Sequence, residues 1–249
     1  MAKETRVALI TGGARRLGAA CARELHRRGL NLVIHCRNSM DDALTLKAEL
    51  EAERRDSVRI LQADLDDCEA VRALAQQALD QWQRIDVLVN NASSFYARPL
   101  VDTDDDDWIR LVHSNLRAPL ILIQSLAPAL ALAEHQGAIV NLVDVYAEKP
   151  LAGHALYSVA KAGLAQLTRA AARELGPAVR VNGVSPGPIL WPEQGQDNQS
   201  DILHGTALKH SGDPSDIAGA VAFLALDAPF ITGQILAVDG RRSLSFHGG

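Results

Sequence analysis

The stretch Val7-Ala8-Leu9-Ile10-Thr11-Gly12-Gly13-Ala14-Arg15-Arg16-Leu17-Gly18 decides the fold. Four apolar residues in succession are typical of a short strand buried on both faces, and the glycine-containing turn after them leads into a segment of helical periodicity. A strand that enters a helix through such a turn is a frequent phosphate-binding unit, because backbone N–H groups at the start of the helix point at the anion. The strict G-x-G-x-x-G pattern is absent, so a turn without a ligand is the alternative at this point.

The same alternation of strand and helix patterns continues along the chain. The apolar runs that predict strands are Val7–Ile10, Leu32–His35, Val58–Leu61, Val87–Val89, Ala138–Val143, Val179–Val184 and Ile235–Val238. The segments of helical periodicity between them are Leu17–Arg28, Asp41–Arg54, Cys68–Trp82, Asp104–Ala133, Leu156–Leu175 and Pro214–Leu226. Such alternation predicts one α/β domain over residues 1–249, a doubly wound parallel sheet of about seven strands with helices on both faces.

The composition describes a globular protein, since 47% of its 249 residues are hydrophobic and 22% are charged. A formal net charge of −5 leaves no basic excess for a nucleic-acid backbone. Cys21, Cys36 and Cys68 are widely spaced and form no metal-binding pattern, which favours a reducing compartment without structural metal. The chain begins without the apolar run of a secretory signal, and its most apolar region, Leu116–Ala133, is interrupted by Arg117 and two prolines. We therefore expect a cytoplasmic protein with neither a nucleic-acid nor a membrane partner.

Two further segments have unusual composition. Residues 186–212 are irregular, follow the sixth predicted strand and are rich in Gly, Pro, Gln and Asn. Because ligands bind beyond the carboxyl ends of the strands in this kind of fold, we expect a substrate loop or lid there. The acidic run Asp104–Asp107 is interpreted as a solvated helix start with Thr103 as its N-cap, rather than as a cation site.

Basic residues lie where a dinucleotide would carry its phosphates. Arg15 and Arg16 sit at the predicted helix N-terminus, where cations are disfavoured unless an anion is bound. The second predicted strand ends in His35-Cys36-Arg37-Asn38-Ser39, and no carboxylate follows before Asp41. An acidic residue at this position binds a ribose 2′-hydroxyl, whereas a cation accepts a 2′-phosphate. The pattern favours NADPH over NADH, with Arg37 as an ordinary surface cation as the alternative.

Tyr157 and Lys161 are four residues apart on a predicted helix, which places a phenol and an ammonium group on one face. A phenol has an ordinary pKa of about 10, and a neighbouring ammonium stabilises its ionised form. The pair could therefore relay a proton near neutral pH. Neither Tyr96 nor Tyr146 has a lysine at the same spacing, although a single Tyr/Lys pair also arises by chance.

Over essentially its whole length, the chain resembles the short-chain dehydrogenase/reductase family. The matching features, in order, are the Thr11-Gly12 turn, Asn90-Asn91-Ala92, Asn115, Tyr157 with Lys161, and Pro186-Gly187. The resemblance implies a Rossmann fold, a nicotinamide cofactor and a homotetramer. It further implies that Tyr157 donates a proton, that Lys161 lowers the pKa of Tyr157 and binds the nicotinamide ribose, and that Asn115 supports the proton relay.

Three departures from the general family pattern resemble the pteridine reductases in particular. Arg16 replaces the middle glycine of the turn, Ser93 replaces the glycine of Asn-Asn-Ala-Gly, and Asp144 stands where the catalytic serine belongs. The resemblance implies that Arg16 and Ser93 contact cofactor phosphate and pterin, that Phe95 stacks on the pterin ring, and that Asp144 works with Tyr157. The stretch from Ile189 to Glu193 looks more like the bacterial dihydromonapterin reductases of the same group, and Ile189 stands where parasite enzymes have a serine.

These matches define the expected site. The expected cofactor-binding residues are Gly12, Arg15, Arg16, Leu17, Gly18, His35, Arg37, Asn38, Ser39, Asp64, Leu65, Asn91, Ala92, Ser93, Tyr157, Lys161, Pro186 and Gly187. The expected substrate-binding residues are Arg16, Ser93, Phe95, Asp144, Tyr157, Pro188, Leu190 and Trp191. The expected catalytic residues are Asn115, Asp144, Tyr157 and Lys161, and no metal is expected.

The exchange of serine for Asp144 suits reduction of a C=N bond, in which hydride goes to carbon and a proton goes to nitrogen. In a dry pocket the pKa of this carboxyl should be raised, which predicts faster turnover below neutral pH. The sequence therefore predicts an NADPH-dependent pteridine reductase, with dihydrobiopterin, dihydromonapterin and dihydrofolate left unranked. A short-chain ketone reductase, for example of 3-oxoacyl thioesters, and a non-catalytic NADP-binding protein remain the alternatives.

A different class, the serine hydrolases, is suggested by Gly183-Val184-Ser185-Pro186-Gly187, with Asp239 and His247 following in the order of such enzymes. The residue after the nucleophile must donate its backbone N–H to the oxyanion, and Pro186 has none. We therefore exclude this class.

Overall fold

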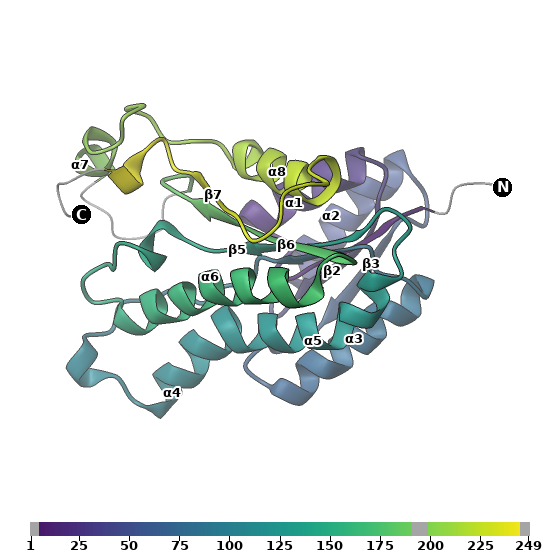
Figure 1. Ribbon diagram of the computed structural model, residues 1–249, viewed down its shortest axis with the longest axis horizontal. Helices are drawn as coiled ribbons and strands as arrows, with labels where there is room; N and C mark the ends of the chain where they lie inside the picture. Colours follow the sequence, from purple (N-terminus) through teal and green to yellow (C-terminus); the bar gives the residue numbers. More distant parts are fainter. Residues whose placement is uncertain (1–4, 191–198, 245–249) are drawn as a thin grey trace.

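The structure is a computed structural model of the chain and describes residues 5–190 and 199–244. Its centre is a parallel sheet of seven strands in the order β3-β2-β1-β4-β5-β6-β7 (Figure 1). The strands are β1 (Val7–Ile10), β2 (Asn31–Cys36), β3 (Val58–Gln62), β4 (Val87–Asn90), β5 (Gly137–Leu142), β6 (Val179–Pro186) and β7 (Ile235–Val238). The predicted doubly wound α/β fold is confirmed, and every predicted strand is present to within a few residues.

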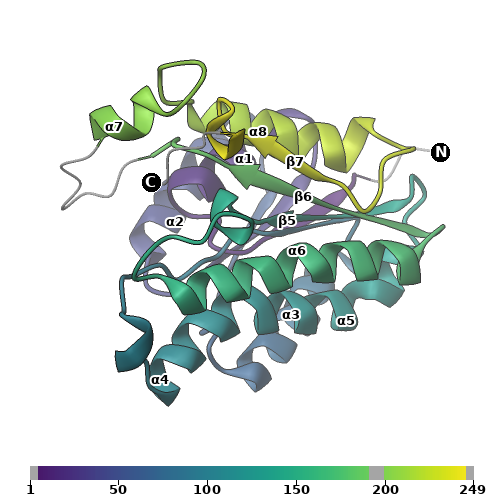
Figure 2. The same ribbon diagram turned by 60° about the vertical axis from the view of Figure 1, so that its left-hand side comes forward.

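Helices cover both faces of the sheet (Figures 1 and 2). One face carries α1 (Arg16–Arg27), α2 (Met40–Glu53) and α8 (Pro214–Ala222), and the other carries α3 (Cys68–Trp82), α5 (Ala118–Ala131) and α6 (Ala155–Leu175). Local sequence starts these helices: the Asp67 carboxylate caps α3 by accepting from Glu69 N, and Asp213 forms a capping box with Asp216 at α8.

Strand β1 shows why the strand sequences are apolar without alternation. Val7 and Leu9 pack into the core on the α3, α5 and α6 side, whereas Ala8 and Ile10 pack into the core on the α1 and α8 side. All four residues are completely buried. Because successive side chains of a strand point to opposite faces, a strand between two helical layers must be apolar at every position.

The strand order reverses beside β1, which pairs with β2 on one side and with β4 on the other. In open parallel sheets a crevice opens at this reversal, beyond the carboxyl ends of the strands, and ligands bind there. The turn after β1 and the segment after β4 both lie at this crevice, as do the ends of β5 and β6. In the described parts of the chain, no helix is long and apolar enough to span a membrane.

The segment after the acidic run differs from expectation in two ways. Asp104, not Thr103, is the N-cap of α4 (Asp105–Trp108), because its carboxylate accepts from Asp107 N while Asp107 accepts from Asp104 N. Asp107 is buried rather than solvated, since its carboxylate also binds the Tyr96 hydroxyl and the Arg98 guanidinium. The helix then widens into a π-helical segment, η2 (Ile109–Arg117), before α5 begins.

The predicted irregular segment 186–212 is partly regular. Pro186 is the last residue of β6, and α7 (Gln199–His204) occupies part of the segment that was expected to be a loop. Residues 191–198 lie outside the described residues, and so does the predicted substrate-binding residue Trp191.

Candidate active site

The turn after β1 is held by hydrogen bonds between main chain and side chain. The Thr11 hydroxyl oxygen accepts from Asn91 N and Ala92 N, each at 3.0 Å. The Asn91 side-chain amide donates to the carbonyl oxygens of Thr11 at 2.9 Å and Gly12 at 3.0 Å. Gly12 has a φ of +59°, and a Cβ on Gly18 would lie 2.1 Å from the Gly12 oxygen. Both positions therefore require glycine, and the turn is fixed to the end of β4.

The His35 side chain holds this turn through a hydrogen bond from Gly12 N. Its Nδ1 accepts from Gly12 N at 3.1 Å and its Nε2 donates to the Ala63 carbonyl oxygen at 3.1 Å, so the ring is the neutral Nε2–H tautomer. Burial lowers the pKa of His35, which favours this neutral form. His35 was expected to bind cofactor directly, and it does line the cavity, but its two ring nitrogens are engaged with backbone atoms.

Arg16 has a left-handed backbone conformation, with a φ of +51°. A non-glycine residue in this region is uncommon, and such strain is often found where a side chain serves a site. Arg16 lines both of the cavities described below. It is the residue that joins them.

The first cavity has a volume of about 430 Å³ and opens at the reversal of strand order. It brings together most residues expected to bind the cofactor, which come from the turn after β1, the end of β2 and the segments after β3 and β4. Its lining includes Gly12, Arg15, Arg16, Leu17, Gly18, His35, Arg37, Asn38, Ser39, Asp64, Leu65, Asn91, Ala92 and Ser93. Asp66 and Ser114 also line it, and the sequence motifs did not point to either residue.

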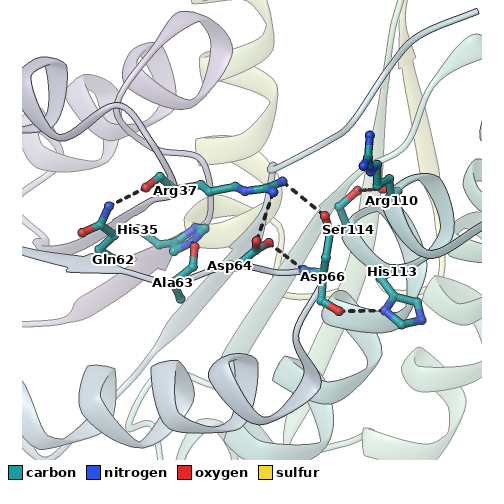
Figure 3. A network of polar contacts seen from close by, with 9 residues as sticks. All are labelled: His35, Arg37, Gln62, Ala63, Asp64, Asp66, Arg110, His113 and Ser114. Atoms are coloured by element: carbon teal, nitrogen blue, oxygen red, sulfur yellow. Dashed lines mark hydrogen bonds and ion pairs between the residues drawn. The ribbon is translucent and has the colours of Figure 1, made fainter. Parts of the chain in front are cut away.

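Three of the residues that line this cavity, Arg37, Asp64 and Asp66, form a charged network (Figure 3). The Arg37 guanidinium lies 3.0 Å from an Asp64 carboxylate oxygen and 3.2 Å from an Asp66 carboxylate oxygen. The Gln62 side chain donates to the Arg37 carbonyl oxygen at 2.6 Å. Arg37 is thus neither a lone cation nor an unattached surface residue, and two carboxylates already hold it.

The second cavity, of about 210 Å³, adjoins the first. Of the residues expected to contact substrate, it brings together Arg16, Phe95, Asp144, Tyr157, Pro188 and Leu190, beside Pro186 and Gly187. Val145, Tyr146, Ile202 and Arg242 also line it, and no motif in the sequence indicated them. Ser93 lies in the first cavity rather than in this one.

Asp144 and Tyr157 meet at the inner wall of the second cavity. Asp144 follows β5 and Tyr157 stands in the first turns of α6, and the Tyr157 hydroxyl donates to Asp144 Oδ2 at 2.7 Å. The other carboxylate oxygen accepts from Tyr146 N at 2.9 Å. Burial raises the pKa of Asp144, as expected from the sequence. This carboxyl therefore holds its proton to a higher pH than an exposed one does.

Lys161 does not act on Tyr157 as the spacing predicted. Its ammonium donates to the Leu142 carbonyl oxygen at 2.8 Å and lies 5.7 Å from the centre of the Tyr157 ring. Burial and the neighbouring Asp144 carboxylate raise the pKa of Tyr157, so the expected lowering is corrected. Burial also lowers the pKa of Lys161 to about 8, and the Asp144 carboxylate opposes this shift only in part.

Asn115 lies in the π-helical segment η2, and its side chain reaches the segment after β4. Its side-chain amide donates to the carbonyl oxygens of Ser94 and Leu111, each at 2.9 Å, and its oxygen accepts from the Ser93 hydroxyl at 2.7 Å. Single π-helical turns inside helices are frequent at functional sites. Here the turn ties the Ser93 region to the helix.

Phe95 forms one side of the second cavity. Its ring stacks on His154 at 4.6 Å and meets the Tyr157 ring edge-on at 4.8 Å. It is nevertheless 44% exposed, which is unusual for a core aromatic. The position fits a ring that faces a ligand better than one that fills the core.

The serine-hydrolase pattern forms no triad among the described residues. Ser185 is buried inside β6, and both carboxylate oxygens of Asp239 are bound by the backbone N–H groups of Arg241 and Ser243. His247 lies outside the described residues.

The parallel sheet, the glycine turn at its reversal and a buried Tyr157 beside a second cavity define a nucleotide-dependent α/β enzyme. The family model for enoyl-(acyl carrier protein) reductase matches residues 12–240. The chain belongs to the short-chain dehydrogenase/reductase family and is an oxidoreductase.

Its similarity to individual relatives does not distinguish their substrates. The chain is 37% identical over 279 aligned residues to pteridine reductase 1 of Leishmania tarentolae, with 96% of each chain covered. It is 35% identical over 243 residues to the 3-oxoacyl-[acyl-carrier-protein] reductase FabG of Staphylococcus aureus, covering 96% of this chain and 98% of that protein. A crystal structure of a blue fluorescent protein from a metagenomic library, in complex with NADPH, is 40% identical with a TM-score of 0.87. That match covers 94% of this chain and 96% of the other.

Proposed function

We propose that the protein is an NADPH-dependent pteridine reductase that transfers hydride to a dihydropterin and yields the tetrahydropterin. The observation that carries the proposal is the buried contact between the Asp144 carboxylate and the Tyr157 hydroxyl at 2.7 Å. Most of the family's reductions act on a carbonyl oxygen, for which a neutral hydroxyl donor at position 144 would be the better partner. A carboxyl that holds a proton suits a ring nitrogen instead.

In the proposed reaction NADPH supplies a hydride to the carbon of the substrate C=N bond, and the nitrogen needs a proton. Tyr157 donates that proton through its hydroxyl, and Asp144, with its raised pKa, returns a proton to Tyr157. Lys161 holds the carbonyl end of β5 by donating to the Leu142 oxygen, and its ammonium lies 5.7 Å from the centre of the Tyr157 ring. Asn115 and Ser93 fix the segment that carries Phe95.

NADPH as the cofactor is supported by Arg37 and Ser39 at the first cavity, by the absence of a carboxylate on the end of β2, and by the NADPH complex of the related structure. The nicotinamide would then lie near Arg16, where the two cavities join. Family resemblance further supports a homotetramer, which analytical ultracentrifugation tests directly.

The pterin ring is supported by the shape of the second cavity. A flat heterocycle can stack between the exposed face of Phe95 and the nicotinamide. Volumes of small-ligand sites usually begin near 300 Å³, so the 210 Å³ cavity suits a single bicyclic ring whose side chain extends outward. Leu190 and Pro188 stand where that side chain would leave.

Reduction of a 3-oxoacyl thioester is the second candidate function, because the bacterial ketone reductases are almost as similar in sequence as the pteridine reductase. Asp144 argues against it for the reason given above. A third candidate, a protein that binds NADPH without catalysis, has to account for the retention of Asn115, Tyr157 and Lys161 together.

The experiment follows the hydride itself. Purified protein is incubated with dihydrobiopterin and NADPH carrying deuterium at the transferred position, and the tetrahydropterin is analysed by mass spectrometry. We expect product with one deuterium on the reduced ring. Unlabelled product, or no product while a 3-oxoacyl thioester becomes deuterated, would contradict the proposal.

A further inference from the structure

Arg37, which lines the first cavity, lies between the Asp64 and Asp66 carboxylates (Figure 3). Its guanidinium is 3.0 Å from Asp64 Oδ2 and 3.2 Å from Asp66 Oδ2. Asp64 and Asp66 are also joined to each other, because Asp66 N donates to Asp64 Oδ1 at 3.0 Å. With Arg37 at +1 and two ionised carboxylates, the three side chains together carry a charge of −1.

The Asp66 carboxylate is more buried than the Asp64 carboxylate and has fewer hydrogen-bond partners among the described residues. Its side chain is only 14% exposed, and its Oδ1 is buried without a hydrogen-bond partner in the described parts of the chain. Its backbone is fixed, since the Asp66 carbonyl oxygen is bound by His113 Nδ1 at 2.9 Å. Asp64, by contrast, has both oxygens engaged and a side chain that is 43% exposed.

A 2′-phosphate would bring about 1.5 to 2 negative charges to this cluster. Arg37 is the cation available to receive it, but Arg37 cannot satisfy the phosphate and two carboxylates equally. A buried carboxylate beside a phosphate is repelled much more strongly than an exposed one, because little water screens the two charges. NADH, which has a hydroxyl at that position, brings no such conflict.

We propose that Asp66 is a specificity-determining residue of the cofactor site: its carboxylate competes with the 2′-phosphate for Arg37 and takes up a proton when the phosphate binds. The proposal rests on NADPH being the cofactor. If Asp66 has this role, its ionised carboxylate weakens NADPH binding at high pH, and protonation of Asp66 at lower pH removes that weakening.

The groups around Asp66 leave its pKa above the ordinary value, as uptake of a proton requires. The groups that face it are Arg37 after β2, Asp64 on its own segment, and Arg110 and His113 of η2. Burial raises the pKa of Asp66, and the Asp64 carboxylate raises it further, while the three basic groups oppose the shift. A phosphate arriving at Arg37 adds a like charge and favours the protonated carboxyl still more.

The test measures the dissociation constants of NADPH and NADH by fluorescence titration for wild type and Asp66→Asn at pH 6 and pH 8. We expect Asp66→Asn to bind NADPH about tenfold more tightly at pH 8 and to leave NADH within about twofold. At pH 6 the advantage should shrink, because wild-type Asp66 then takes up the proton. The phosphate itself has a pKa near 6 and carries less charge at pH 6, which reduces the advantage in the same direction, so the comparison at pH 8 is the deciding one.

Two further variants separate this effect from others. Asp80→Asn changes the net charge equally, but Asp80 lies on α3, its carboxylate accepts from the Gln76 side chain and it lines neither cavity, so NADPH affinity should stay unchanged. In an Arg37→Ala background the gain from Asp66→Asn should become smaller, because the competition for Arg37 is gone and only the direct repulsion between carboxylate and phosphate remains. An equal gain for NADH, no gain at pH 8, or a gain that is undiminished without Arg37 would overturn the proposal. If Asp66→Asn does not fold, Asp66→Ser serves the same comparison.

The Arg37→Ala variant alone also distinguishes failure of this proposal from failure of the proposed cofactor. If it weakens NADPH binding while Asp66→Asn has no effect, the role of Asp66 is wrong and the cofactor assignment stands. If Arg37→Ala leaves NADPH binding unchanged, Arg37 does not hold the 2′-phosphate and the role of Asp66 is wrong; wild-type protein that binds NADH as tightly as NADPH is the result that would contradict the cofactor.

Discussion

The Tyr157 hydroxyl donates a 2.7 Å hydrogen bond to the Asp144 carboxylate at the inner wall of the second cavity. Burial and the Asp144 carboxylate both raise the pKa of Tyr157, while burial raises the pKa of Asp144 against the opposing effect of the Tyr157 hydrogen bond. A phenol held in this way keeps its proton until a substrate nitrogen competes for it. The pair therefore fits donation of a proton better than abstraction of one.

Tyr157→Phe should lower the turnover of dihydropterin by about two to four orders of magnitude, the size of a lost general acid. NADPH binding should not change, because the ring remains in place. Stopped-flow turnover and fluorescence titration measure the two quantities. Tyr96→Phe is the matched control, since that hydroxyl binds Asp107 away from both cavities, and it should retain wild-type turnover.

The pH dependence of turnover tests Asp144. Its pKa is raised above the ordinary value, so its protonated fraction grows as the pH falls, and turnover should rise from pH 8 toward pH 5. Asp144→Asn cannot donate its proton onward, so it should be slower and should lose the acidic rise. A rate that climbs steadily toward pH 9 in the wild type would remove Asp144 from the proton path.

Phe95→Ala should raise the KM for dihydropterin by about tenfold, the factor that corresponds to roughly 1.4 kcal/mol of lost stacking and contact. The protein should lose little stability, because Phe95 is 44% exposed. Steady-state kinetics and thermal unfolding check the two parts. A large drop in melting temperature with an unchanged KM would mean that the ring is a core residue.

Two glycines give opposite predictions for stability. In Gly18→Ala the new Cβ would lie 2.1 Å from the Gly12 carbonyl oxygen, which should destabilise the fold by about 1–3 kcal/mol and weaken NADPH binding. In Gly219→Ala, inside α8, the new Cβ meets nothing within 4 Å and should stabilise the fold by roughly 0.5–1 kcal/mol. Chemical denaturation of the two variants checks the signs.

The fold could be predicted from the sequence because its signals are local. The apolar run Val7–Ile10, the glycine turn and the alternation of periodicities each depend on residues that are adjacent in the chain. The prediction of Thr103 as the N-cap was wrong. Asp104, one residue later, is a stronger acceptor, and its backbone N–H also donates to the Asp107 carboxylate. The π-helical turn at Asn115 leaves no periodic signature in the sequence.

The site was less predictable, because its contacts join distant segments. The spacing of Tyr157 and Lys161 suggested a direct charge effect, but the ammonium turns to the Leu142 carbonyl oxygen instead. The contact of Arg37 with Asp66 depends on β2 and β3 lying side by side, as the pairing of Cys36 with Gln62 shows. No residue spacing within one segment carries that information.

The most direct test of the pteridine reductase assignment compares two substrates with the same purified protein. NADPH oxidation is followed by absorbance with dihydrobiopterin and, separately, with an acetoacetyl thioester between pH 5 and pH 8. We predict turnover of the pterin that increases toward acidic pH, and turnover of the thioester that is at least a hundredfold slower, about 2.7 kcal/mol in transition-state stabilisation. Turnover of the thioester alone, or NADPH binding without oxidation by either substrate, would contradict the assignment.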